Sequence, residues 1–244
     1  CKDFCNQPNR GLEDVERIFI RTTDLLKNCA HQEEEYIERG IRIIKEKEEE
    51  IDYVTWSLWR NVHISFRSGS YITELAWFDP YELISYSGCS KLLERAGDYC
   101  ASIACLIGQI YNIYKLEVQN LQKLSKLDEI LSELSEMFFE FPDIYEEATQ
   151  YFLKSPNSPT NHENSSKSDK AEVFQSISAP KIFRINYVRK YCSRLQDIYG
   201  GTDLENLVES ISGLDPTIQI KIAKLMGELS EKIRRLVTYP YNIM

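Results

Sequence analysis

Residues 79–113 read DPYELISYSGCSKLLERAGDYCASIACLIGQIYNI, and this stretch decides the fold class. Asp79-Pro80 is a helix start signal, because Asp caps the first turn and Pro is tolerated at the first helical position. Beyond it, one set of residues recurs at alternating spacings of three and four, the period of a buried helix face: Leu83, Tyr86, Ser90, Leu93, Gly97, Cys100, Ala104 and Ile107. Half of these residues are small, so we expect a neighbouring helix to approach this face closely.

Helical periodicity also dominates the rest of the chain. A seam before this stretch contains Ile41, Ile44, Ile51, Leu58 and Val62, with Glu48 and Thr55 at the remaining positions. The clearest heptad follows it, at Leu124, Leu127, Leu131, Leu134, Phe138 and Phe141. Together with Gly40 as a stop signal and Pro142 as a restart point, these patterns predict helices over 11–38, 41–66, 80–113, 124–141, 142–153, 170–199, 203–212 and 216–239.

The composition agrees with a compact, helix-rich chain. The 244 residues carry a net charge of −9 and are 43% hydrophobic, which excludes disorder over most of the length. Ten Gly and eight Pro are few for a sheet-rich fold with many tight turns. We see no signal peptide and no apolar run near the ~20 residues of a bilayer span. Seven cysteines without zinc-type spacing indicate reduced thiols, so we expect a cytoplasmic protein.

Two segments of the chain resemble each other in order and spacing. Ile51-Asp-Tyr-Val54 recurs as Ile185-Asn-Tyr-Val188, and the start signal Asp79-Pro80 recurs as Asp215-Pro216. We therefore predict an all-α fold of two tandem three-helix bundles with long antiparallel helices. The predicted segments are an N-terminal tail at 1–10, a first bundle at 11–113, and a second bundle at 114–244 with a polar loop at 155–169.

Carboxylates give the strongest indication of chemistry. Glu48 and Asp52 form one i, i+4 pair, and Glu94 and Asp98 form another, so each pair shares a helix face. Two pairs that meet across antiparallel helices would gather four anionic groups, which need a metal, nearby cations or a shared proton. Oxygen ligands suit Mg, Mn, Ca or Fe. The alternative is that these acids form ion pairs with residues such as Arg42 and Arg95.

The segment Leu92-Leu-Glu-Arg-Ala-Gly-Asp-Tyr-Cys-Ala-Ser-Ile103 resembles the signature helix of PhoU-type phosphate-uptake regulators. Upstream, Glu48-Glu-Glu-Ile-Asp52 is similar to the E/DxxxD stretch of that family, and Asp79-Pro-Tyr-Glu-Leu83 fits the start of the signature helix. The resemblance covers roughly residues 36–110 and is much weaker beyond 114. It implies two three-helix bundles in tandem, as does the internal repeat.

The resemblance also implies a role. It indicates a non-enzymatic regulator of phosphate uptake that contacts the ATPase subunit of a phosphate ABC transporter and, where present, a sensor kinase. Its metal-binding carboxylates map onto Glu48, Asp52, Glu94 and Asp98, with divalent or iron-type ions as the implied cofactors. We further expect a homodimer, because the helices are long and one stripe is rich in small residues.

Two other classes of function remain open. The first is a transcription regulator, if a DNA-binding domain precedes Cys1. The second is a carboxylate-bridged metal enzyme, although none of the three histidines has a Glu three residues before it, as that class requires. The chain also has no P-loop, GxGxxG, GxSxG or HExxH motif, so we expect no catalysis.

The second repeat departs from the acidic pattern. Ile182 and Asn186 stand where Glu48 and Asp52 stand in the first repeat. In the last helix the equivalent positions hold Arg234 and Thr238, or Ser230 and Arg234 in the other alignment. A cation beside an arginine meets like charge. We therefore expect metal in the first bundle only.

Overall fold

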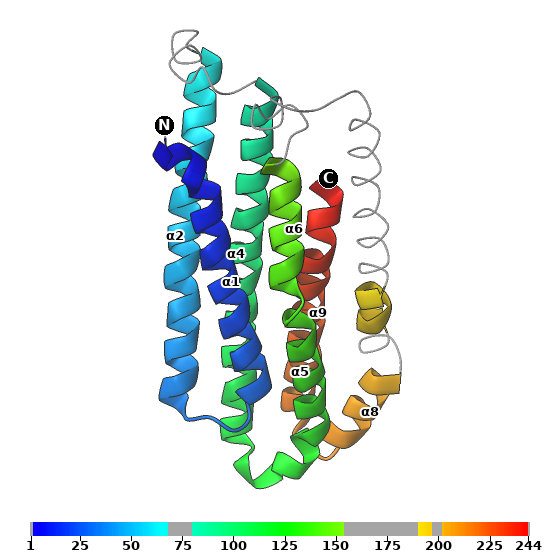
Figure 1. Cartoon of the computed structure of the whole chain (residues 1–244). Helices are drawn as coiled ribbons and strands as arrows, with labels where there is room; N and C mark the ends of the chain where they lie inside the picture. Colours follow the sequence, from blue (N-terminus) through cyan, green and yellow to red (C-terminus); the bar gives the residue numbers. More distant parts are fainter. Residues whose placement is uncertain (1, 68–79, 154–189, 197–201, 244) are drawn as a thin grey trace.

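The computed structural model describes residues 2–67, 80–153, 190–196 and 202–243, and this part of the chain is an all-α helical bundle (Figure 1). Its elements are α1 (Lys2–Asn28), α2 (Glu34–Arg67), α4 (Pro80–Leu116), the 3-10 helix η1 (Val118–Leu124), α5 (Ser125–Phe138), α6 (Phe141–Leu153), α8 (Thr202–Ile211) and α9 (Pro216–Ile243). Residues 190–196 are also helical. Among these helices, none combines the length and the hydrophobicity that a bilayer crossing needs.

The four longest helices, α1, α2, α4 and α9, run alternately in opposite directions (Figure 1). α1 descends from the N-terminus, α2 returns beside it, and α4 descends again. α5 and α6 then ascend in line, and α9 ascends to the C-terminus. α4 is central, since it packs against α1, α2, α6 and α9. The predicted all-α fold with long antiparallel helices is confirmed.

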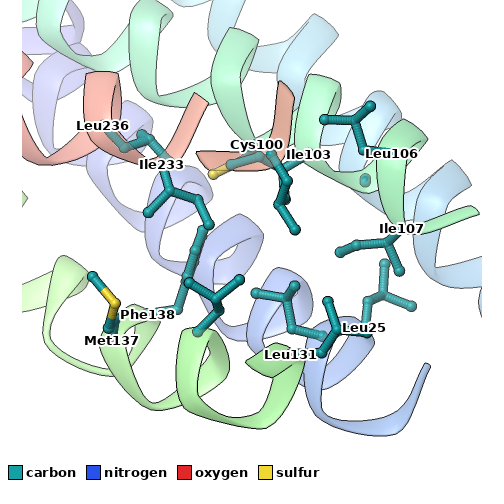
Figure 2. Packing of buried hydrophobic residues seen from close by; sticks show 14 of the residues in the cluster. Leu25, Cys100, Ile103, Leu106, Ile107, Leu131, Met137, Phe138, Ile233 and Leu236 are labelled. Carbon is teal, nitrogen blue, oxygen red and sulfur yellow. The ribbon is translucent and has the colours of Figure 1, made fainter. Parts of the chain in front are cut away.

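The interior is a continuous hydrophobic cluster to which α1, α2, α4, α5, α6, α8 and α9 all contribute. Figure 2 shows how labelled residues from four of these helices meet there, among them Leu25, Ile103, Phe138 and Ile233. The predicted heptad lines this cluster, because all six of its residues are buried: Leu124, Leu127, Leu131, Leu134, Phe138 and Phe141. Pro142 restarts the helix as expected, since α6 begins at Phe141.

A cluster of four aromatic rings packs α1 against the α5–α6 segment. The Phe19 ring lies 5.0 Å from the Tyr145 ring, 5.5 Å from the Phe141 ring and 6.3 Å from the Phe138 ring, measured between centroids. All four rings are buried. Edge-to-face and tilted contacts of this kind add to the stabilisation that burial gives. The first and second halves of the chain therefore share packing at this point.

The turn between the first two helices lies earlier in the chain than the sequence predicts. We predicted a break at Gly40, but the chain turns at residues 29–33 and Gly40 lies inside α2. A Cβ at Gly40 would lie 2.6 Å from Leu25 Cδ2 and 3.3 Å from Arg21 Nε. Glycine is therefore needed here for the close approach of α1 and α2, and it does not end a helix.

The predicted division into units stays a prediction. The boundary near residue 113 falls in the last turns of α4, and the hydrophobic cluster continues on both sides of it. α1 begins at Lys2, within the segment 1–10 that we expected to be a tail. The polar loop expected at 155–169 lies outside the described residues, as does most of the helix expected over 170–199.

Candidate metal centre

Three carboxylates converge where α2 meets α4. Glu48 and Asp52 come from α2, and Asp98 comes from α4. One carboxylate oxygen of each residue lies within 4.8 Å of the corresponding oxygen of the other two. Oxygens this close can share one cation as ligands, and an all-carboxylate set suits a hard divalent ion. Among the described residues, this is the one such group of His, Cys, Asp and Glu side chains.

The packing of α4 on α2 explains why the acids meet. Gly97 faces α2, and a Cβ added there would lie 3.4 Å from Glu48 Cγ and 3.8 Å from Glu48 Cα. A larger side chain at this position would push the two helices apart. Two turns further along, Thr55 Oγ1 donates a hydrogen bond to the Ser90 carbonyl at 3.2 Å. The small residues of the α4 stripe thus allow the close approach that the sequence predicts.

The electrostatics of the group favour a positive partner. Partial burial raises the pKa of Glu48, and the negative charges of Asp52 and Asp98 raise it further. Partial burial also raises the pKa of Asp52, with Asp98 adding to the effect, whereas a hydrogen bond with Glu48 opposes it. Burial is the larger cause of both shifts, and the added effect of the neighbouring acids means that the ionised forms repel one another. A bound cation would relieve this repulsion, and so would a shared proton.

Glu94 is the fourth carboxylate that we predicted, and it does not belong to the group of three. It is half-buried one turn from Asp98 on α4. Burial raises the pKa of Glu94, the charges of Asp98 and Asp52 act in the same direction, and the positive charges of Arg95 and Lys91 oppose them. Glu94 therefore contributes to the field around the group without being one of its three converging carboxylates.

Arg95 supplies a positive charge at the edge of the group. Its Nη1 donates a hydrogen bond to Asp98 Oδ2 at 3.0 Å. Partial burial lowers the pKa of Arg95, but a hydrogen bond with Tyr239 and the charge of Asp98 outweigh this effect and raise it. Tyr239 comes from α9, 144 residues away in the chain. The sequence indicates Arg95 as an ion-pair partner of the acids, whereas no local pattern in it points to Tyr239.

Both interpretations of the acids therefore find a geometric counterpart. Asp98 is engaged with Arg95 through one oxygen, which leaves its other oxygen for a second partner. Glu48 and Asp52 have no such ion pair among the described contacts, and Arg42 instead lies 4.0 Å from Glu46. The acids of α2 are thus the part of the group whose charge most requires a partner from solution.

The segment predicted to be a second repeat presents different chemistry where the structure describes it. Arg234 on α9 binds Glu231 through two hydrogen bonds of 2.9 and 3.0 Å, and the Thr238 hydroxyl donates to the Arg234 carbonyl. These contacts form an exposed ion pair. Ile182 and Asn186 lie outside the described residues.

The thiols of the described chain are poor candidates for chemistry. Cys29, Cys89, Cys100, Cys105 and Cys192 are all free, and the first three are buried. Burial raises the pKa of Cys29 and Cys89 to about 12, so both remain protonated and unreactive at neutral pH. They behave as small hydrophobic residues of the core.

Comparison of the chain with protein-family models, with curated proteins and with solved structures finds no match. The residues themselves are therefore the guide to its function. What they define is an all-α bundle with an acidic group at a helix–helix contact.

Proposed function

We propose that this chain is a PhoU-like regulatory protein that binds a divalent cation through Glu48, Asp52 and Asp98. The observation that carries the proposal is the convergence of three carboxylate oxygens within 4.8 Å of one another. These acids belong to the two stretches that resemble the PhoU-type family. The resemblance supplies the regulatory part of the proposal, and the geometry supports the cation.

In this proposal the cation ties α2 to α4. Two ligands at i and i+4 on one helix and a third on the opposing helix resist separation of the two helices. Because an ion that binds only the folded chain stabilises it by mass action, occupancy would be coupled to the stability of the α2–α4 contact. Arg95 would compete with the cation for the Asp98 carboxylate.

Metal titration of the chelator-treated protein tests the cation. We expect Mn²⁺ or Mg²⁺ at a hundredfold excess over its Kd to stabilise the wild type by about 2.7 kcal/mol. Asp52→Asn/Asp98→Asn should lose this response. The matched control is Glu205→Gln/Glu209→Gln, which removes two exposed i, i+4 carboxylates from α8. Calorimetry and thermal melts that show equal responses in all three proteins would refute the site.

Single variants separate the three converging acids from Glu94. Asp98→Asn removes a carboxylate of the group, whereas Glu94→Gln removes one that lies outside it. We expect Asp98→Asn to weaken cation binding more strongly than Glu94→Gln. The reverse order would show that Glu94 is a ligand and that the group is wrongly assigned.

The regulatory part has its own test. We propose contact with the ATPase subunit of a phosphate transporter, and with a sensor kinase where one exists. Affinity capture from native lysate, grown in high and in low phosphate, should recover such a subunit in a phosphate-dependent amount. Recovery of promoter DNA alone would favour a transcription regulator instead.

A further inference from the structure

The outer face of α2 carries three exposed aromatic side chains. Tyr53, Trp56 and Trp59 are 72%, 55% and 44% exposed, and they follow one another at spacings of three residues. α1 and α4 pack against α2 along its buried residues Ile51 and Leu58. The three rings together expose on the order of 400 Å². A patch of this size is typical of an interaction surface.

Charged residues flank the aromatic patch with opposite signs at its two ends. Toward the N-terminus of α2, Glu46 and Glu49 are exposed, and with Arg10 of α1 they line a groove of about 520 Å³ beside Tyr53. Toward the C-terminus, the Arg60 guanidinium lies 5.5 Å from the centre of the Trp56 ring. The His63 ring lies 4.0 Å from the Trp59 ring. The face therefore changes from acidic through aromatic to basic along its length.

The order of charged and aromatic residues along α2 is symmetric about Trp56. Glu49 and His63 stand seven residues before and after it, Asp52 and Arg60 stand four residues before and after it, and Tyr53 and Trp59 stand three. If a second α2 helix lies antiparallel on the first with a two-fold axis at Trp56, Glu49 meets His63, Asp52 meets Arg60, and the rings meet in the middle. A parallel arrangement would place Glu49 on Glu49 and Arg60 on Arg60.

We propose that this face of α2 binds a second copy of the chain in an antiparallel, two-fold arrangement centred on Trp56. Such a contact is isologous, because the same surface serves on both copies. With a rise of about 1.5 Å per residue, the contact from Glu49 to His63 extends about 21 Å. Lys45 and Arg67, eleven residues on either side of Trp56, carry like charges and set the limit of the pairing.

The aromatic patch supplies about half of the surface that a standard interface needs, which is about 800 Å² per partner. The flanking charged side chains supply the remainder and fix the direction of the pairing. Trp56 lies at the centre, where buried aromatic residues carry most of the energy of a contact. The small-residue stripe of α4 does not serve this purpose, since Ser90, Cys100 and Ala104 are buried inside the chain.

Charge reversal provides a test that depends on the antiparallel geometry. His63→Glu places acid against Glu49 of the second copy, and Glu49→Lys places base against its His63. Each variant alone should therefore dimerise at least about tenfold more weakly than the wild type. A mixture of the two variants restores opposite charges at both contacts, so heterodimers should form. Neither residue belongs to the acidic group, so both variants keep its three carboxylates.

Analytical ultracentrifugation of the full chain measures the outcome against the monomer mass of 28.5 kDa. Glu205→Lys, which makes the same change of charge on α8, is the control and should dimerise like the wild type. Trp56→Ala should weaken the dimer without changing the helical circular dichroism. A wild type that stays monomeric at its highest soluble concentration would overturn the proposal. A mixture of the two variants that stays monomeric would overturn it too. So would a dimer whose Kd is the same in the wild type and in all of these variants.

Discussion

Replacing Phe19 with Ala tests the packing that joins α1 to the second half of the chain. Phe19 is fully buried, and its ring lies within 5.0–6.3 Å of the Phe138, Phe141 and Tyr145 rings, between centroids. Truncation to Ala removes these contacts and leaves a cavity between α1, α5 and α6. The neighbouring residue Ile20 is 60% exposed, so Ile20→Ala is a control on the same turn of the same helix.

The expected loss is large because the site is closed on all sides. Phe→Ala in a packed core costs about 3–5 kcal/mol, which combines the lost transfer free energy with the cavity. For a chain of this size, each kcal/mol lowers Tm by roughly 2–4 °C, so we expect Tm to fall by about 6–20 °C. Ile20→Ala should change the free energy of unfolding by less than about 0.5 kcal/mol.

Tryptophan fluorescence and helical circular dichroism together make the assay specific, because they report on different parts of the chain. All three Trp residues, at 56, 59 and 77, precede α4, whereas helical circular dichroism reports on the whole chain. Because Phe19 links the two halves, its loss should shift both melting curves together. A fall in Tm no greater than that of Ile20→Ala would refute the packing argument. A shift seen by one probe alone would show that the halves unfold separately.

Substitutions at four single sites have further expected outcomes. Gly227→Ala should stabilise α9 by about 0.5–1 kcal/mol because no atom lies within 4 Å of the added Cβ. Gly40→Ala should instead destabilise the chain, since its Cβ meets buried Leu25, and urea titrations of the two variants measure both changes. Burial and nearby carboxylates raise the pKa of Glu48 above 4.5, so the folded chain holds this proton more tightly than the unfolded chain. The resulting stabilisation is present below pH 4.5 and is lost as pH rises through the folded pKa. Glu48→Gln should therefore raise Tm at pH 7 in chelator, and melts that show a lower Tm would contradict this. Asp215→Ala should lower Tm, because Asp215 Oδ1 accepts a hydrogen bond from the Thr217 amide at 2.8 Å as an N-cap. The bonds to the amides of the first turn lower the pKa of Asp215, so its stabilisation is lost as pH falls through that value. An unchanged Tm in Asp215→Ala at pH 7 would count against the cap.

Local patterns predicted the helices that carry their own periodicity. The α2 seam is buried at Ile44, Ile51 and Leu58, and the α9 cap at Asp215 stands where the sequence places it. These features depend on residues within a few turns of one another, and one sequence contains all of that information. The same holds for the i, i+4 pair Glu48 and Asp52, whose members share a helix face.

The first turn could not be predicted because distant residues hold it. Residues 29–33 contain no Gly or Pro, whereas Gly40 is a strong local stop signal. In the structure, His31 Nε2 lies 3.2 Å from Asp128 Oδ2 on α5. Lys115 at the end of α4 donates to Glu34 Oε2 at 2.6 Å. These partners are 97 and 81 residues away, and only the folded chain brings them to the turn.

Which acids make up the acidic group also depends on residues that are distant in the sequence. Helical spacing places Glu94 and Asp98 on one side of α4, but it does not say which of the two meets α2. That choice depends on the crossing of the helices at Gly97 and on the side-chain partners there. Asp98 reaches the α2 acids, whereas Glu94 lies outside the group of three. Tyr239 enters the surroundings of Arg95 only through the packing of α9 on α4.

One helix thus offers different surfaces to three kinds of neighbour. α2 buries Ile51 in the bundle, directs Glu48 toward Asp98, and exposes Trp56 on its outer face. Asp52 stands at the border, since it belongs to the acidic group and also lies one turn from Trp56. In our proposals, a cation at Asp52 reduces the negative charge that Arg60 of a second copy would meet. Linkage then requires the second copy to weaken cation binding by the same factor by which the cation weakens the dimer.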